Sequence, residues 1–181
     1  MENNFKVHQL WATPIYENYI PVKDNWVNFA KSEDYKRMAS ENGDITKDYY
    51  ILEKLPDLKK EIENHINLFV EKYLKVTKDV SFYVTNSWII QHHPNDQAQA
   101  HFHTNSLLSG VYYLDVPKNS GDIRFLRMEQ MQFVFPSSFN INYSENTYQN
   151  CYDYPVGTTD GKILIFPSHI NHGVWKNETN K

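Results

Sequence analysis

The chain contains eight histidines, and the spacing of three of them is its clearest sign of chemistry. His101 and His103 lie two residues apart in a strand-like segment, so their side chains are expected to project from one face. Two imidazoles at this spacing can bind one metal ion, and His172 is the best candidate for a third ligand. Three such ligands leave coordination positions open for chemistry. The alternative is that His101 and His103 are surface strand residues and that His172 caps a turn.

The remaining five histidines carry less information. His93 lies at a predicted strand end and could line the pocket, whereas its neighbour His92 is expected at the surface. His169, in the same turn as the third candidate ligand, is expected to face solvent or to support a ligand. His8 and His65 are most simply structural or solvated.

The residues before position 80 are expected to form an edge strand and two helices that position this site. The expected segments are a strand or arm at 9–20 with Pro14 near a sheet edge, a helix at 24–35 capped by Asp24, a polar turn region at 36–50, and a helix at 57–76 capped by Asp57. The last helix carries apolar residues on a 3.6-residue period, namely Leu58, Ile62, Ile66, Phe69, Tyr73 and Val76. Such a stripe needs a flat apolar surface, which a sheet face would supply.

From residue 80 onward, short segments rich in β-branched and aromatic residues predict strands. They are Val80–Gln91, Gln99–His103, Leu107–Val116, Asp122–Leu126, Gln132–Phe135, Lys162–Phe166 and His172–Trp175. The segment at 136–158 lacks a clear period and is expected to be a long loop, with aromatic residues at Phe139, Tyr143, Tyr148, Tyr152 and Tyr154. Helices followed by a run of strands indicate an α+β fold with a β-sandwich or barrel.

Composition excludes several classes of protein. The 181 residues suit one domain, and the net charge of −4 without a basic run argues against nucleic acid as a partner. The single cysteine, Cys151, excludes an intramolecular disulfide and a cysteine-rich metal site. No apolar stretch is long enough to span a membrane, and the first ten residues do not resemble a secretory signal. A soluble cytoplasmic protein is therefore expected.

Several motifs, taken in order, resemble a known family. They are Asn86-Ser87-Trp88, His101-Phe102-His103-Thr104-Asn105-Ser106, Leu108-Ser109-Gly110-Val111-Tyr112-Tyr113-Leu114, and Phe166-Pro167-Ser168-His169-Ile170-Asn171-His172-Gly173-Val174. Together they resemble a putative 2-oxoglutarate/Fe(II) oxygenase family of bacteria and phages that is distantly similar to the prolyl hydroxylases. The likeness covers residues 84–177, and the segment at 11–16 also resembles the opening of that family.

The resemblance implies a fold and an activity. The fold would be one domain, with a double-stranded β-helix (a jelly-roll barrel) at 80–181 and the N-terminal arm and helices of 1–79 packed on one sheet. His101, His103 and His172 would be the ligands of Fe(II), with 2-oxoglutarate as the cosubstrate. A dioxygenase of this kind hydroxylates its substrate and releases succinate and CO2, and the protein supplies orientation and exclusion of water.

The resemblance also implies residues that bind 2-oxoglutarate. Tyr113 matches the position that hydrogen-bonds the distal carboxylate, and Ser109 lies on the same face of the strand. Because neighbouring residues of a strand point to opposite faces, at most one of Tyr112 and Tyr113 can enter the pocket. The further pocket candidates are Asn86, Trp88, His93 and Asn105.

Two features depart from the pattern of the wider superfamily. Position 103 is a histidine where an aspartate or glutamate is usual, which leaves the site one unit more positive and also suits zinc or nickel. Carboxylates at Asp96, Asp115 and Asp122 do not have the right spacing to His101. An arginine or lysine is normally found about one strand after the last histidine, and Lys181 is the candidate here. We also expect the chain to lack the last strand of the barrel.

Two other functions compete with the oxygenase. One is a three-histidine, cupin-like metalloenzyme whose substrate itself chelates the metal, without 2-oxoglutarate. The other is a jelly-roll binding module without catalysis, whose aromatic loop grips a carbohydrate or a protein. The expected substrate is a small molecule or a peptide, and a homodimer is compatible with the sequence.

Overall fold

The computed structural model describes residues 6–8, 12–39, 42–127 and 141–180. Their strands form three antiparallel sheets. The first has the order β1 (Tyr16–Tyr19), β9 (Lys162–Pro167), β6 (Leu108–Tyr112). The second has the order β5 (Ala98–His101), β10 (Asn171–Val174), β7 (Ile123–Leu126), β8 (Asp153–Val156). The third and smallest joins β2 (Tyr35–Arg37), β3 (Asp44–Thr46) and β4 (Ile90–Gln91).

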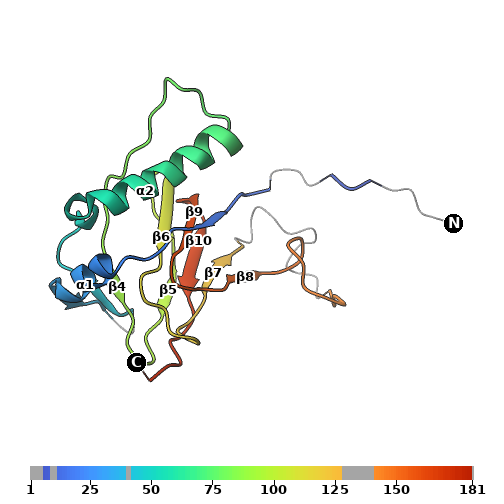
Figure 1. The fold of residues 1–181 in the computed structure, drawn as a ribbon. Coiled ribbons are helices and arrows are strands. Elements are labelled where there is room, and N and C mark those ends of the chain that lie inside the picture. Colours follow the sequence, from blue (N-terminus) through green and yellow to red (C-terminus); the bar gives the residue numbers. More distant parts are fainter. Residues whose placement is uncertain (1–5, 9–11, 40–41, 128–140, 181) are drawn as a thin grey trace.

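The helical segments precede most of these strands. They are α1 (Asp24–Ser32), the 3-10 turn η1 (Ile51–Lys54), α2 (Pro56–Asn67) and the π-helical turn η2 (Leu68–Tyr73). In Figure 1, α1 and α2 lie to one side of β9, and β7 and β8 lie to the other. No helix among the described residues is long and apolar enough to cross a membrane.

Strand β9 is the centre of the molecule because both of its faces are buried. Ile163 and Ile165 face the helices and pack in a cluster with Trp26, Leu58 and other helical residues. Leu164 and Phe166 point to the opposite face, where they pack against Ile123 and Phe125 of β7. A strand covered on both faces reads as a continuous apolar run, and this explains why Ile163-Leu164-Ile165-Phe166 shows no alternation. The layers are therefore helices, the β1-β9-β6 sheet, and the β5-β10-β7-β8 sheet.

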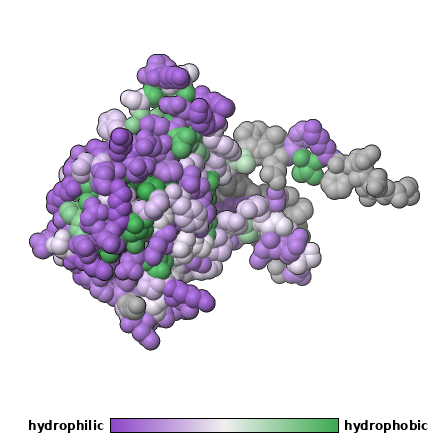
Figure 2. Space-filling view, viewed as in Figure 1, coloured by the Kyte–Doolittle hydropathy of each residue, from purple (hydrophilic) through white to green (hydrophobic). Residues whose placement is uncertain are grey.

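This mixed architecture with mainly antiparallel sheets confirms the predicted combination of helices and strands. Two core sheets packed face to face are compatible with the expected jelly roll, while a complete double-stranded β-helix stays a prediction. On the face drawn in Figure 2, hydrophobic residues are scattered among more numerous hydrophilic ones.

The helix boundaries correct two predictions. Asp24 and Asp57 lie inside the first turns of α1 and α2, and neither is the N-cap. The Asp57 carboxylate instead accepts a hydrogen bond from Trp26 Nε1 at 3.1 Å and pairs with Lys23 Nζ at 3.0 Å, so it ties α2 to α1. The apolar stripe of the second helix packs as predicted at Leu58 and Phe69, but Tyr73 is 65% exposed because η2 changes the helical period.

Several strand predictions were also wrong. The region 36–50, expected as a polar turn, contains β3 and the end of β2, whose three-residue strands are too short and polar to show alternation. Of Val80–Gln91 only β4 is a strand, and Ser87 before it forms an isolated bridge with Tyr50. Strand β8 lies within the expected loop. The strand predicted at Gln132–Phe135 falls outside the described residues.

Candidate metal centre

The three candidate ligands come from two neighbouring strands and the loop between sheets. His101 is the last residue of β5, and His172 lies directly opposite it on β10. Residues opposite each other on antiparallel strands share a face, so both imidazoles point the same way. His103 lies beyond the end of β5, where its backbone N–H donates to Ser168 O at 2.9 Å. The prediction that one strand presents both residues is therefore wrong in detail, yet the loop brings His103 to the same place.

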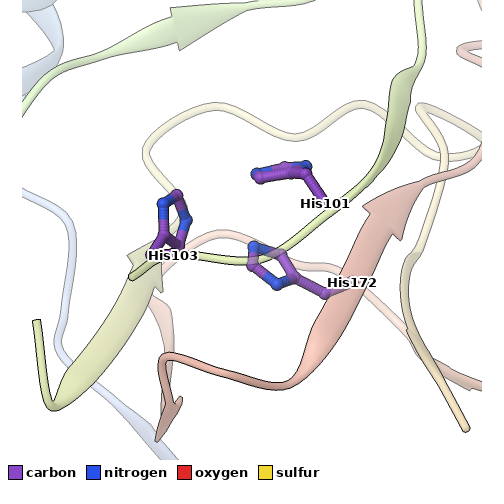
Figure 3. Close-up of side chains that lie close together, drawn as sticks. All are labelled: His101, His103 and His172. Carbon is purple, nitrogen blue, oxygen red and sulfur yellow. The ribbon is translucent and has the colours of Figure 1, made fainter. Parts of the chain in front are cut away.

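The three imidazole rings converge on one point (Figure 3). Their centroids are 4.4 Å apart for His101 and His172, 5.1 Å for His101 and His103, and 5.3 Å for His103 and His172. One ring nitrogen from each residue lies within 4.8 Å of the corresponding atoms of the other two. Metal-bound nitrogens at about 2.0–2.1 Å from a shared ion would lie about 3 Å apart, so small side-chain rotations suffice to close the site.

Backbone carbonyls select the tautomers of two of these histidines. His101 Nδ1 lies 2.8 Å from Gln99 O, and His172 Nδ1 lies 2.9 Å from Ile170 O. Because a carbonyl oxygen can only accept, each Nδ1 carries the proton and each Nε2 keeps its lone pair. A partner on the second nitrogen is the usual way in which proteins orient metal-binding histidines.

Burial keeps two of the three candidate ligands, His103 and His172, neutral. His172 is 7% exposed and packs against Phe166 with ring centroids 4.8 Å apart. Desolvation lowers the pKa of His172 to about 4, against a usual value near 6.5. Desolvation also lowers the pKa of His103, and the neighbouring His101 adds to this effect. His103 and His172 are therefore unprotonated near pH 7, as metal ligands must be.

Three serine hydroxyls hold the segments that carry His103 and His172. Ser168 is 1% exposed, and its Oγ lies 2.8 Å from both Ser106 Oγ and Ser109 Oγ. Ser106 follows His103 in the loop, Ser168 precedes His172, and Ser109 belongs to β6. The hydroxyl of Ser109, which the resemblance assigns to the cosubstrate, is engaged in this cluster.

The two adjacent tyrosines of β6 and its continuation point in opposite directions, as strand alternation requires. Tyr112 Oη donates to Ile20 O at 3.1 Å on the side of the helices. Tyr113 packs between the two core sheets, and its buried hydroxyl has no hydrogen-bond partner among the described residues. Burial, reinforced by Asp122, raises the pKa of Tyr113, so the hydroxyl keeps its proton. An unpartnered buried donor is costly and suits an anionic acceptor.

The other predicted residues lie in different surroundings. His93 Nε2 lies 2.8 Å from Asp44 Oδ2 of the small sheet, away from the group of three histidines. His92, expected at the surface, is partly buried, and desolvation lowers its pKa. Asn105 is exposed in the loop after His103. Lys181 lies outside the described residues.

Sequence reasoning missed the residues that wall and orient the site. Phe125 and Phe166 flank His172, and the carbonyls of Gln99 and Ile170 orient two imidazoles. Tyr49 was also missed; it packs against the predicted pocket candidate Trp88, which in turn packs against His103. The positions of backbone carbonyls cannot be predicted from residue types. The spacing of Phe125 two residues after the apolar Ile123, by contrast, could have predicted that its ring faces the core.

The residues fit an iron ion and one end of 2-oxoglutarate. Three neutral imidazole nitrogens are suitable donors for Fe(II), and the Tyr113 hydroxyl is a free donor for a carboxylate. Both basic residues on the strands of the core sheets are already paired: Lys162 Nζ with Glu17 Oε1 at 2.9 Å, and Arg124 Nη1 with Asp153 Oδ2 at 3.0 Å. These strands therefore do not supply the basic residue that is expected to pair with the distal carboxylate of 2-oxoglutarate.

Comparison with known proteins identifies a protein family that matches part of the chain. A family model described as "Putative 2OG-Fe(II) oxygenase" matches residues 86–181, which is slightly more than half of the chain. The matched segment contains all three histidines and Tyr113. No curated protein matches the sequence.

Proposed function

Because the chain belongs to the putative 2OG-Fe(II) oxygenase family, we propose that it is an Fe(II)- and 2-oxoglutarate-dependent dioxygenase that hydroxylates a C–H bond. The observation that carries this proposal is the convergence of His101, His103 and His172. When bound, Fe(II) supplies the oxidising chemistry: one oxygen atom of O2 enters the substrate as a hydroxyl group, the other enters succinate, and the C1 carboxylate of 2-oxoglutarate leaves as CO2.

The chain's own residues would bind, orient and exclude water. The three imidazoles would hold the metal from one side, since the tautomers of His101 and His172 direct Nε2 away from the backbone carbonyls. Phe125 and Phe166 cover the buried side of His172. His101 is exposed, so access from solvent lies on the side of β5. Tyr113 would donate its hydroxyl proton in a hydrogen bond to the distal carboxylate of 2-oxoglutarate.

Succinate formation tests the proposal. Purified protein with Fe(II), ascorbate and 2-oxoglutarate is expected to form succinate and CO2 slowly even without a prime substrate. The reaction should require both Fe(II) and 2-oxoglutarate and should be lost in His101→Ala. The matched control is His169→Ala, which replaces an exposed histidine outside the group of three. Succinate that forms equally in His101→Ala, or none from the folded, iron-loaded protein, would contradict the assignment.

A second candidate is favoured by the donor set itself. Three neutral ligands lack the carboxylate of the usual site, and the described strands of the two core sheets offer no unpaired cation for 2-oxoglutarate. A three-histidine metalloenzyme whose organic substrate chelates the metal would share both features. It predicts that 2-oxoglutarate changes neither the absorption of the Co(II)-loaded protein nor its melting temperature.

A further inference from the structure

A row of side chains leads away from the candidate metal centre, with Trp88 and Lys36 exposed and the half-buried Tyr49 between them. The ring of Trp88 lies 6.2 Å from that of His103, and the ring of Tyr49 lies 6.1 Å from that of Trp88. Lys36 Nζ lies 5.1 Å from the centroid of the Tyr49 ring. We refer to Trp88, Tyr49 and Lys36 as the Trp88 strip. It begins at a metal ligand and ends at a positive charge.

The register of the small sheet places Lys36 on one face with Ile45 and Ile90. Lys36 lies opposite Ile45 on β3, and Ile45 lies opposite Ile90 on β4. Trp88 comes two residues before Ile90, just ahead of β4. Trp88 is 39% exposed and Ile90 is 44% exposed. Apolar side chains gathered on one exposed face mark an interaction surface more often than isolated ones do.

The backbone under the strip is firmly held. Ser87 N donates to Tyr49 O at 2.9 Å, and Ile51 N donates to Ser87 O at 3.1 Å. Ser87 Oγ accepts a hydrogen bond from Leu52 N at 2.9 Å. These bonds join the chain beside Trp88 to the chain beside Tyr49. The two rings are therefore preorganised, which reduces the entropy lost when a ligand binds.

The charge at the far end of the strip has no ion-pair partner among the residues that the structure describes. Neighbouring basic residues form ion pairs, Arg37 with Asp96, Lys47 with Asp34, and Lys54 with Asp48. Among the ion pairs of the described residues, none involves Lys36. The ammonium group thus contacts an aromatic ring and is available to a single anionic group.

We propose that the Trp88 strip binds the substrate, and that the substrate is an extended peptide segment with an acidic residue near the residue that is oxidised. This rests on the proposed function. An apolar side chain would pack on Trp88 and Tyr49, and the acidic side chain would pair with Lys36. Three contacts of five to six ångströms separate His103 from Lys36, and an extended chain rises about 3.3 Å per residue. These contacts set an upper limit on the separation, so the acidic residue lies within about six positions of the oxidised one.

The chain disfavours a nucleic acid on the same surface. Its net charge is −4, and only one unpaired cation belongs to the strip. A polynucleotide carries one phosphate per residue and is bound through several cations. Stacking on aromatic rings alone does not distinguish the two ligands, so the test includes both.

Binding of defined peptide pools tests the inference without relying on turnover. The probes are fluorescent pools of about twelve residues that contain apolar positions and one aspartate at scanned positions, and matched pools with asparagine in its place. Binding to the Ni(II)-loaded full chain is measured by fluorescence polarisation. The aspartate pool is expected to bind about fivefold more tightly or better, in line with about 1 kcal/mol for an exposed ion pair.

Two variants and a control locate the site. Lys36→Glu should abolish the preference for aspartate, and Trp88→Ala should weaken both pools. Lys47→Glu, at an exposed lysine outside the strip, should keep the preference. Melting temperatures verify that each variant is folded. Equal binding of the two pools, a preference that survives Lys36→Glu, or tighter binding of a thymidine oligonucleotide would overturn the inference.

The outcomes separate this inference from the proposed function. Succinate formation by the unmodified protein, with no preference between the peptide pools, would leave the oxygenase and remove the peptide surface. Peptide binding that depends on Lys36, with no succinate under any condition, would leave the surface and remove the oxygenase.

Discussion

Tyr112 and Tyr113 carry the same hydroxyl group into opposite surroundings. Tyr112 donates to a backbone carbonyl, whereas the buried Tyr113 hydroxyl has no partner among the described residues. The replacement of each by phenylalanine therefore has opposite consequences. Tyr113→Phe removes an unsatisfied donor, so the free energy of unfolding without cosubstrate should stay unchanged or rise by up to about 1 kcal/mol. Tyr112→Phe should lower it by about 1 kcal/mol, because a hydrogen bond is lost.

The same pair separates stability from cosubstrate binding. Tyr113→Phe should weaken 2-oxoglutarate binding to the Co(II)-loaded protein about tenfold, and Tyr112→Phe should leave it unchanged. Urea denaturation gives the stabilities, and titration of the Co(II) absorption gives the affinities. A Tyr113→Phe protein that unfolds more readily yet binds 2-oxoglutarate normally would assign this hydroxyl to the fold alone.

The sequence predicted which residues form the candidate site more fully than it predicted how they are held in place. The spacing of His101 and His103 and the position of His172 were sufficient to name three ligands, which the structure brings together. The carbonyls that orient them and the pairing of Lys162 with Glu17 depend on contacts between segments distant in sequence. Such contacts leave no local signal.

At the scale of elements, one carboxylate joins the small sheet to the segment that leads into β5. Asp96 is 3% exposed and accepts hydrogen bonds from both terminal nitrogens of the Arg37 guanidinium and from His93 N. Asp96→Asn should lower the free energy of unfolding by about 2 kcal/mol, because hydrogen bonds to a charged group are replaced by neutral ones. The matched control is Asp34→Asn, where an 87% exposed side chain lies 3.7 Å from Lys47 Nζ and about 0.5 kcal/mol or less is expected.

The effect of Asp96 should depend on pH in one direction. The hydrogen bonds from Arg37 hold the pKa of Asp96 at about 2, below its usual value. A carboxyl group with a lowered pKa stabilises the folded state above the unfolded pKa of about 3.9 and loses this contribution as pH falls toward 2. The difference in stability between wild type and Asp96→Asn should therefore be constant from pH 7 to about pH 5 and shrink below pH 4. A difference that grows on acidification would exclude this ion pair as its cause.

The serine cluster makes a second prediction about elements. Ser168→Ala removes the shared partner of Ser106 and Ser109 at the turn before His172. We expect a loss of about 2 kcal/mol in stability and a severalfold weaker affinity for Co(II), because the loops that carry His103 and His172 lose a common anchor. Ser109→Ala removes only one of the two bonds and should cost about half as much. Equal metal affinity in both variants and wild type would show that the cluster does not position the ligands.

Sequence patterns predicted elements well where burial is one-sided or complete. The sequence predicted α2 at its beginning because its apolar residues recur with the helical period. It predicted β9 because that strand is a continuous apolar run. The strands β2, β3 and β8 were missed because each has three or four residues with polar side chains. Ion pairs such as Arg37 with Asp44 and Arg124 with Asp153 support these strands, and their partners are seven and 29 residues apart in sequence.

At the scale of the whole molecule, the three histidines come from segments that are far apart in the sequence but adjacent in the fold. His101 and His172 lie on neighbouring strands of one core sheet, and His103 lies in the loop that leads to β6 of the other, so a metal ion bound by all three would join these segments. Metal binding to the folded state alone stabilises it by about 2.7 kcal/mol when the free ion exceeds the dissociation constant a hundredfold. For a domain of this size, this corresponds to a rise of roughly 5–10 °C in melting temperature.

The melting temperature of the full chain in Co(II) or Ni(II), compared with the chelator-treated protein, measures this linkage. Wild type and His169→Ala should show the rise, and His101→Ala should lose it, since His101 is exposed and its removal leaves the core intact. The rise should also diminish on acidification and be lost once the pH falls below the pKa of His172, about 4, because protons compete with the metal for the imidazole nitrogens. An equal rise in His101→Ala would place the metal elsewhere in the chain, and both the site and the oxygenase assignment would then lose their support.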